Sequence, residues 1–247
     1  MEKSILPAAW DVPQIFRNRL GDQVGRQRPM AADGHLLLVL HAPPKPEQND
    51  RAGRFFWRSP DGKWTSKDLG TGLNAVNKHL DDYNSIIARL DKEEDEATSA
   101  DDYFALLDHL APLLRAARNM HNVLQEARQM CPEIREIINL RDRAYEIQRT
   151  AELLYEGAKD TLDVIVAKRA EEQTRASHRM EVSAYRLNIL AAFFFPIATL
   201  TAIFGVNMRH GLEDWPSPLP FFCVITIGLI LGAALSVFIT RPPSDSI

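Results

Sequence analysis

The hydrophobic pattern divides the chain into a mixed N-terminal part and an apolar C-terminal end. Two runs near the end of the chain, residues 189–206 and Leu219–Thr240, contain no charged side chain, and residues 207–218 separate them. Each run has about 18–22 residues, the length that a helix needs to cross roughly 30 Å of hydrocarbon. The pattern therefore predicts two transmembrane helices joined by a short loop.

Before residue 71, apolar stretches alternate with proline and glycine. His35–His41 (HLLLVLH) is typical of a buried strand. Residues 54–58 (RFFWR) and 63–66 (KWTS) flank Ser59-Pro60-Asp61-Gly62, a strong turn signal, so we expect them to form a β-hairpin. Residues 42–53 are expected to form a polar loop. This part of the chain is therefore predicted to be a small α+β layer.

Apolar residues at helical spacing predict two helices between residues 71 and 130. We expect an acidic break between them over residues 91–96 and 98–102, with Ser99 as the N-cap of the second helix. Pro132 is expected to begin a longer helix that runs through the charged residues 168–186 into the first apolar run. At 1.5 Å per residue it would be roughly 110 Å long. Such a helix needs neighbouring copies of itself, which predicts a bundle of identical subunits.

The fold class is therefore α+β, with a long helix that continues into the first of two C-terminal transmembrane helices. The expected divisions are an α+β domain over residues 1–130, a stalk helix over 131–186, a transmembrane domain over 187–240 and a tail over 241–247. The average composition, with a net charge of −4, hides this split, because residues 1–186 carry almost every charge. The first residues show no signal-peptide pattern. Cys131 and Cys223 lie in different parts, so we expect both to be reduced.

Basic residues indicate how the spans are oriented. Those that precede the first run are Lys168, Arg169, Arg175, Arg179 and Arg186. Arg241 follows the second run, whereas the connecting loop contains only Arg209. Because basic residues stay on the cytoplasmic side, both termini are expected in the cytoplasm and the loop outside. The chain is thus expected to be a multi-pass protein of the inner or plasma membrane.

The first span carries a resemblance to a known family. Residues 185–190 (YRLNIL) and 194–207 (FFPIATLTAIFGVN) resemble the first span of the CorA family of divalent-cation transporters. That family ends this span with an aromatic residue and Gly-Met-Asn, and has a proline eleven residues before the Asn, as Pro196 stands before Asn207 here. Val206 replaces the Met, a change that occurs in CorA-like and ZntB-like members. The short loop, the C-terminal second span and the long stalk agree with this resemblance.

The resemblance implies a homopentamer with an ion entrance formed by Gly205, Val206 and Asn207. Five copies of Asn207 would then make a ring of amide oxygens at the outer mouth. Such a ring can bind the waters of a hydrated Mg²⁺, which sheds its shell reluctantly. Gly205 would let the backbone turn so that Asn207 points inward. In the alternative interpretation Asn207 only caps the end of the span.

A stripe of mostly small side chains along the first span is expected to line the pore. Heptad spacing and the family resemblance together identify Leu187, Asn188, Ala191, Phe195, Ala198 and Ala202. The two criteria disagree over Leu187 and Asn188. The alternative is a seam where helices pack closely in lipid. In the second span, Gly228, Gly232 and Ser236 are expected to pack against the first.

Carboxylates suggest two further roles. Glu213 and Asp214 in the loop could concentrate cations at the mouth, or belong to an ordinary polar loop. In the family, cytoplasmic acidic residues at subunit contacts bind metal and close the pore. Asp81, Asp82, Asp142 and Glu146 are candidates for that role here, and the alternative is a solvated acidic surface.

No signature of catalysis stands out, because the sequence has no zinc-spaced His/Cys cluster, phosphate loop or nucleophile elbow. We expect no enzyme activity, no cofactor besides the transported ion and no nucleic-acid partner. The expected function is a CorA-like homo-oligomeric channel or transporter for divalent cations, Mg²⁺ first and also Co²⁺, Ni²⁺ or Zn²⁺. Two alternatives remain: a ZntB-like Zn²⁺ transporter coupled to protons, and a non-conducting membrane scaffold or regulator on the same frame.

Overall fold

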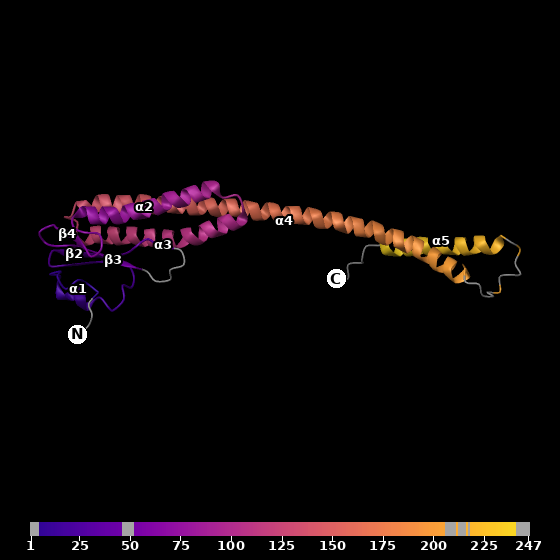
Figure 1. Cartoon of the computed structure of the whole chain (residues 1–247), viewed down its shortest axis with the longest axis horizontal. Coiled ribbons are helices and arrows are strands. Elements are labelled where there is room, and N and C mark those ends of the chain that lie inside the picture. Colours follow the sequence, from indigo (N-terminus) through magenta and orange to yellow (C-terminus); the bar gives the residue numbers. More distant parts are fainter. Residues whose placement is uncertain (1–4, 46–51, 206–210, 212–215, 217, 241–247) are drawn as a thin grey trace. The chain divides into compact units, whose positions relative to one another are not determined.

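A computed structural model describes residues 5–45, 52–205, 211, 216 and 218–240. The chain divides into two compact units, Met1–Ala167 and Lys168–Ile247, called here the N-terminal and C-terminal units. The element order is a short helix, four strands and then four helices, as Figure 1 shows along the sequence colours. The expected α+β class, with a long helix continuing into the C-terminal part, is confirmed.

The N-terminal unit contains an antiparallel sheet in the order β1-β2-β3-β4, formed by Arg28–Ala32, His35–His41, Gly53–Arg58 and Trp64–Ser66. The predicted strand β2 is confirmed, and so is the hairpin, in which Arg58 pairs with Trp64. Every residue of β2 after His35 is buried. Leu36, Leu38 and Leu40 belong to the core shared with the helices, whereas Leu37 and Val39 face the core of the N-terminal segment. Because both faces are covered, the strand has a continuous apolar sequence.

Two elements of this unit were not predicted. Strand β1 pairs with β2 through a tight turn at Asp33 and Gly34, whose φ angles are 50° and 76°. Positive φ at both central residues is typical of the hairpin turn that Asp-Gly favours, so this dipeptide was the missed signal. Helix α1, Gln14–Asn18, buries Phe16 and is too short for a periodic pattern.

The two predicted helices are confirmed as α2, Leu73–Glu96, and α3, Ala100–Met130. Ser99 caps α3 as predicted, in a reciprocal capping box with Asp102. The acidic break is shorter than predicted, because α2 continues to Glu96 and α3 begins at Ala100. Residues 91–96 are mostly Glu and Lys, which favour helices, and nearly all of them are exposed; Arg89 also pairs with Glu93 one turn away at 3.4 Å. The chain leaves the helix at Ala97, which is extended.

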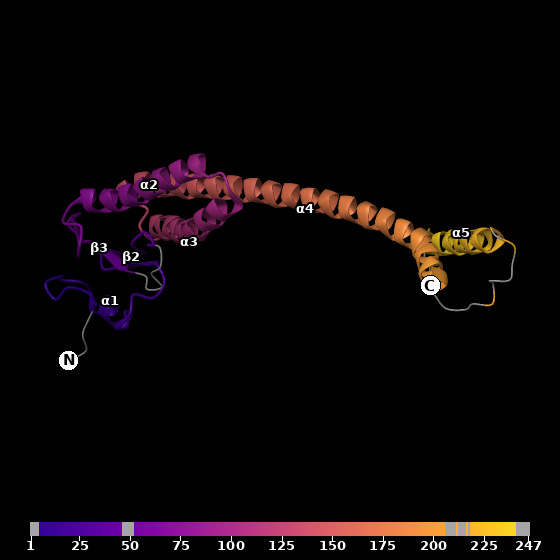
Figure 2. The same ribbon diagram turned by 45° about the vertical axis from the view of Figure 1, so that its right-hand side comes forward.

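Helix α4, Glu136–Gly205, is the predicted long helix and contributes to both units. It begins after Pro132 rather than at it, because Ile134 and Ile138 donate to Cys131 and Arg135 in tight turns. Its first part lies beside α2 and α3 in the N-terminal unit (Figures 1 and 2). Apolar residues on this part enter the same core as the helices and the sheet: Ile137, Leu140, Ala144, Ile147, Ala151, Ala158 and Leu162.

The C-terminal unit contains the rest of α4 and helix α5, Leu219–Thr240. Both helices include stretches long and apolar enough to cross a membrane, with mean hydropathies of 2.0 and 2.3. Residues 168–181 of α4, which precede its apolar part, are all exposed and carry the basic cluster. The expected two-helix end of the chain is therefore present as helical structure.

Candidate ion pathway

The two apolar helices of the C-terminal unit approach each other at glycines. A Cβ atom on Gly232 would lie 2.6 Å from the backbone oxygen of Phe193, and one on Gly228 would lie 3.0 Å from Cγ1 of Ile197. Both glycines are buried, whereas most neighbouring residues of α5 are exposed. The expected packing of α5 on α4 through its small residues is confirmed at these two positions.

Polar groups within the apolar part of α4 are satisfied by the helix itself. The hydroxyl of Thr199 donates to the carbonyl of Phe195 at 2.8 Å, and that of Thr201 donates to Ile197 at 2.6 Å. Pro196 has no amide proton and cannot make the helical bond to Ala192. It is buried in this unit. These hydroxyls are used within the helix, which lowers their cost in an apolar environment.

The expected pore-lining residues all lie on the exposed part of α4: Leu187, Asn188, Ala191, Phe195, Ala198 and Ala202. Leu187 is 68% exposed and Phe195 is 70% exposed. The residues of α4 that lie against Gly232 and Gly228 of α5 are Phe193 and Ile197. At about 100° per residue, these two lie on the side of the helix roughly opposite Phe195. One face of α4 therefore packs on α5, and the face with the expected pore residues is left open.

The ion entrance falls mostly outside the described residues. Gly205 is the last residue of α4, and a Cβ atom there would meet nothing within 4 Å. Val206, Asn207, Glu213 and Asp214 lie outside the described part of the chain. Their expected roles stay predictions.

Three of the four candidate regulatory carboxylates contact arginines in the N-terminal unit. Asp81 Oδ1 lies 2.6 Å from Arg143 Nη2, which links α2 to α4. Asp142 Oδ1 lies 2.6 Å from the neighbouring Arg141 Nη2. Glu146 accepts the Thr150 hydroxyl through its backbone carbonyl only. Within residues 5–45, 52–205 and 218–240, no group of three or more His, Cys, Asp or Glu residues is placed to hold a metal.

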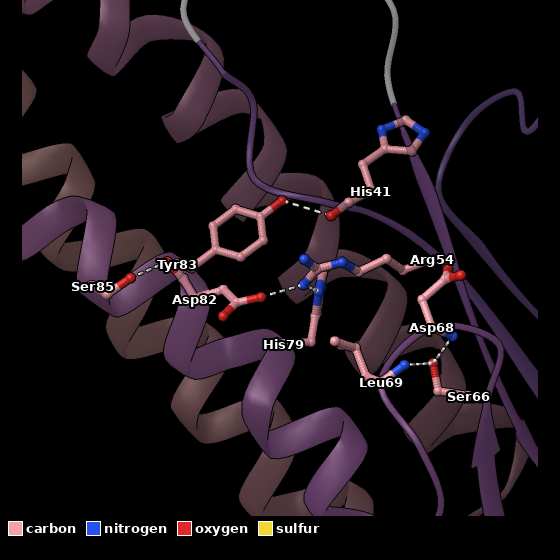
Figure 3. A network of polar contacts seen from close by, with 9 residues as sticks. All are labelled: His41, Arg54, Ser66, Asp68, Leu69, His79, Asp82, Tyr83 and Ser85. Carbon is pink, nitrogen blue, oxygen red and sulfur yellow. Dashed lines mark hydrogen bonds and ion pairs between the residues drawn. The ribbon is translucent and has the colours of Figure 1, made fainter.

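Asp82, the remaining carboxylate, belongs to a polar network that the sequence did not reveal (Figure 3). Its Oδ2 lies 2.6 Å from Arg54 Nη1, which also contacts His79 Nδ1 at 3.0 Å. The Tyr83 hydroxyl donates to the His41 carbonyl at 2.9 Å, and burial raises the pKa of Tyr83. Arg54 and His79 are 25 residues apart, so no local spacing pattern could join them.

A polar α+β unit followed by two apolar helices with a glycine-mediated contact defines a class of integral membrane protein. The family described as CorA-like Mg²⁺ transporter protein matches residues 65–240 of the sequence, which is more than half of the chain. The chain therefore belongs to this family of divalent-cation transporters. Membership places it among transporters rather than enzymes.

The solved structures that are similar to this chain include those of two proteins named CmaX and CorA. The full-length CmaX protein is 16% identical, with 92% of this chain and 83% of CmaX covered, and a TM-score of 0.53. The CorA magnesium transporter from Methanocaldococcus jannaschii is 14% identical, with 90% and 81% covered, and a TM-score of 0.43. The likeness to CmaX shows that the fold is shared. No curated protein matches the sequence.

Proposed function

We propose that this chain forms a homopentameric channel that conducts divalent cations, Mg²⁺ first, into the cell. The observation that carries the proposal is the open face of α4, which holds every expected pore-lining residue and lies opposite the face that packs on α5. Five such faces around an axis would enclose a path along the spans. Membership in the CorA-like family supports divalent cations as the transported ions.

The composition of the open face favours contact with other copies over contact with lipid. Asn188 is exposed there in the single chain, and a polar amide is costly when it faces hydrocarbon. Ala191, Ala198 and Ala202 have small side chains that let helices approach one another closely. Phe195 would form an apolar constriction between these small positions. A face that mixes small, polar and aromatic residues suits the lining of a narrow, gated path.

The ion entrance in this proposal is a ring of Asn207 amides, with Glu213 and Asp214 attracting cations to the mouth. Amide oxygens can bind the water shell of Mg²⁺ without holding the ion tightly. Inward movement would need no ATP, because a divalent ion gains about 4.6 kcal/mol per 100 mV of membrane potential. The candidate regulatory carboxylates Asp81, Asp82, Asp142 and Glu146 would act at contacts between copies. In one described chain three of them already pair with arginines.

The test is Mg²⁺ uptake into liposomes that contain the full-length protein and a negative interior potential. We expect Asn207→Ala to remove most of the flux, whereas Asn74→Ala, at an exposed position of α2, should leave it unchanged. Equal flux in the two variants would exclude the Asn207 ring. If no divalent ion passes at all, the chain is the non-conducting scaffold or regulator.

The replacement of Met by Val206 favours a second candidate, a ZntB-like Zn²⁺ transporter coupled to protons. The same liposomes distinguish the two. Zn²⁺ flux that disappears with a protonophore, without Mg²⁺ flux, would establish the second candidate. Mg²⁺ flux that follows the potential and ignores the proton gradient would establish the first.

A matched pair of substitutions tests the pore face itself. Ala198→Phe adds a large ring on the open face and should block flux. Ile203→Phe exchanges one large exposed side chain for another on the flank of α4, roughly 80° around the helix from Phe195, and should not. Native mass measurement in detergent should give a pentamer for both variants and for the wild type. A monomer or dimer would contradict a pore on an axis between copies.

A further inference from the structure

A cavity of about 590 Å³ lies in the N-terminal unit, away from the membrane helices. It is bounded by the segment before β1, by β1 itself, by His41 at the end of β2 and by the second half of α3. The side chains that give it a chemical character are Arg19, Arg26, Gln27, Arg28, Asn119 and Asn122. Its volume is in the range of pockets that hold metabolites and nucleotides.

Positive charge dominates this cavity. Three arginines line it against a single carboxylate, Glu126. In the described part of the chain, no ion pair includes Arg19, Arg26 or Arg28. Burial, and then the charge of Arg26, lower the pKa of Arg28. The charged groups of Arg26 and Arg28 are therefore close enough to repel each other, and an anion beside them would relieve that repulsion.

The role of Arg28 differs from that of the other two arginines. Its Nη1 donates to the carbonyls of Arg26 at 3.0 Å and Val24 at 3.3 Å, and its Nη2 to that of Arg19 at 3.5 Å. Arg28 thus holds the segment that forms one wall of the cavity. Arg19 and Arg26 are exposed, so their guanidinium groups can reach a ligand.

The cavity also has groups that can bind a neutral polar part of a ligand. Gln27 is 8% exposed, and its Nε2 donates to the carbonyl of Ala116 at 3.0 Å. Its Oε1 is buried and has no hydrogen-bond partner among the residues that the structure describes. Because this oxygen has almost no accessible surface, Gln27 helps to build the wall of the cavity and does not face a ligand. Asn119 and Asn122 instead provide two exposed amides on α3.

We propose that this cavity binds a phosphate-bearing small molecule of nucleoside monophosphate size. Arginine is the preferred side chain for phosphate because its planar fork makes paired, charge-assisted hydrogen bonds. Arg19 and Arg26 would bind the phosphate. The side-chain amides of Asn119 and Asn122 would form hydrogen bonds with the hydroxyl and amino groups of the nucleoside. This site is independent of the ion path on α4.

The test is isothermal titration of the full-length protein in detergent with AMP, ATP and inorganic phosphate, each in EDTA. Chelation of divalent ions keeps metal binding by the transporter out of the signal. We expect AMP to bind with a Kd below about 1 mM and inorganic phosphate to bind more weakly. Absence of binding by all the probes would overturn the proposal. Equal binding of phosphate and AMP would overturn its nucleoside part.

Variants with opposite expected effects on the affinity for AMP make the test specific. The double substitution Arg19→Gln/Arg26→Gln should weaken AMP binding by about tenfold or more, because it removes charge-assisted contacts. Glu126→Gln should strengthen binding by removing the one carboxylate that lines the cavity among the residues that the structure describes. Arg115→Gln, an exposed arginine on α3 outside the cavity, is the matched control and should change nothing. Equal Kd values in all variants would overturn the site, and unchanged thermal unfolding would show that each variant is folded.

Discussion

His79 shows how one buried residue can make the stability of the N-terminal unit depend on pH. Its side chain is fully buried, and its ring packs on Phe56 and Tyr83. Arg54 can only donate, so Nδ1 of His79 accepts and the proton of the neutral ring is on Nε2. Burial, and then the charge of Arg54, lower the pKa of His79 to about 3. The folded protein therefore keeps this imidazole neutral.

This pKa predicts that acid destabilises the N-terminal unit through His79. An unfolded chain binds a proton at the ordinary histidine pKa of about 6.5, but the folded unit does not until the pH approaches 3. Stability should therefore fall as the pH drops from about 6.5 towards 3, by up to about 1.4 kcal/mol per pH unit. His79→Gln should remove most of this dependence. Thermal unfolding at pH 7 and pH 5, followed by tryptophan fluorescence, measures it.

The control is His178→Gln, which changes an exposed histidine of α4. It should lose as much stability between the two pH values as the wild type does. A pH dependence that is the same in His79→Gln and in the wild type would show that other groups cause it.

Gly232 is a second residue whose role depends on what lies against it. Because its missing Cβ would lie 2.6 Å from the Phe193 oxygen, Gly232→Ala must push α5 away from α4. We expect a loss of about 1–3 kcal/mol, the usual cost of overpacking. Gly157→Ala is the matched control, because Gly157 is an exposed helical residue with nothing within 4 Å of its Cβ position. It should stabilise by about 0.5–1 kcal/mol through helix propensity. Thermal unfolding in detergent measures both variants. Equal unfolding midpoints for Gly232→Ala and Gly157→Ala would contradict the close approach of α5 to α4.

At the scale of the element, the junction between α2 and α3 depends on one cap. The Ser99 hydroxyl accepts from the Asp102 amide at 3.2 Å, and the Asp102 carboxylate accepts from the Ser99 amide at 2.8 Å. Hydrogen bonds from Ser99 and Thr98 lower the pKa of Asp102, so the cap keeps its charged form down to acidic pH. The last turn of α2 is acidic and contains no basic residue. The cap of α3 follows it after Ala97 and Thr98.

We expect that removing the Ser99 cap lowers the stability of the protein measurably. Ser99→Ala should lower the free energy of unfolding by about 1 kcal/mol, because an orphan amide of α3 loses its partner. Ser99→Asp should retain most of the stability, since Asp is an equally good cap. Ser177→Ala, at an exposed position within α4, is the control and should have little effect. Chemical denaturation followed by fluorescence distinguishes them, and equal losses in the two alanine variants would exclude a capping role.

Elements with a distinctive local pattern were predictable, even the three-residue β4 beside its turn, whereas α1 and β1 were not predicted. The run HLLLVLH and the turn at Ser59–Gly62 predicted β2 and the β3–β4 hairpin because burial and turn chemistry are local. Strand β1 has only five residues, including Pro29, and no alternation. Its position depends on pairing with β2, which its own residues do not encode.

At the scale of the whole molecule, the basic residues before the first span predict the orientation in the membrane. Single cysteines in a Cys131→Ala/Cys223→Ala background test it. Ser217→Cys, in the loop between the spans, should react with a membrane-impermeant maleimide on intact cells. Ser177→Cys, in the basic segment, should react only after the cells are permeabilised. The reverse pattern would place both termini outside.

The sequence by itself determined that a long polar helix continues into a first apolar span and that a second apolar span follows. It also determined that the first span resembles that of the CorA family. These features follow from uninterrupted runs and local spacing, which need no partner elsewhere in the chain. Only the tertiary structure decided which face of α4 packs on α5, that Arg54 joins His79 to Asp82, and that three arginines meet at one cavity. Each of these depends on residues brought together from distant positions, and their contacts are set by packing rather than by periodicity.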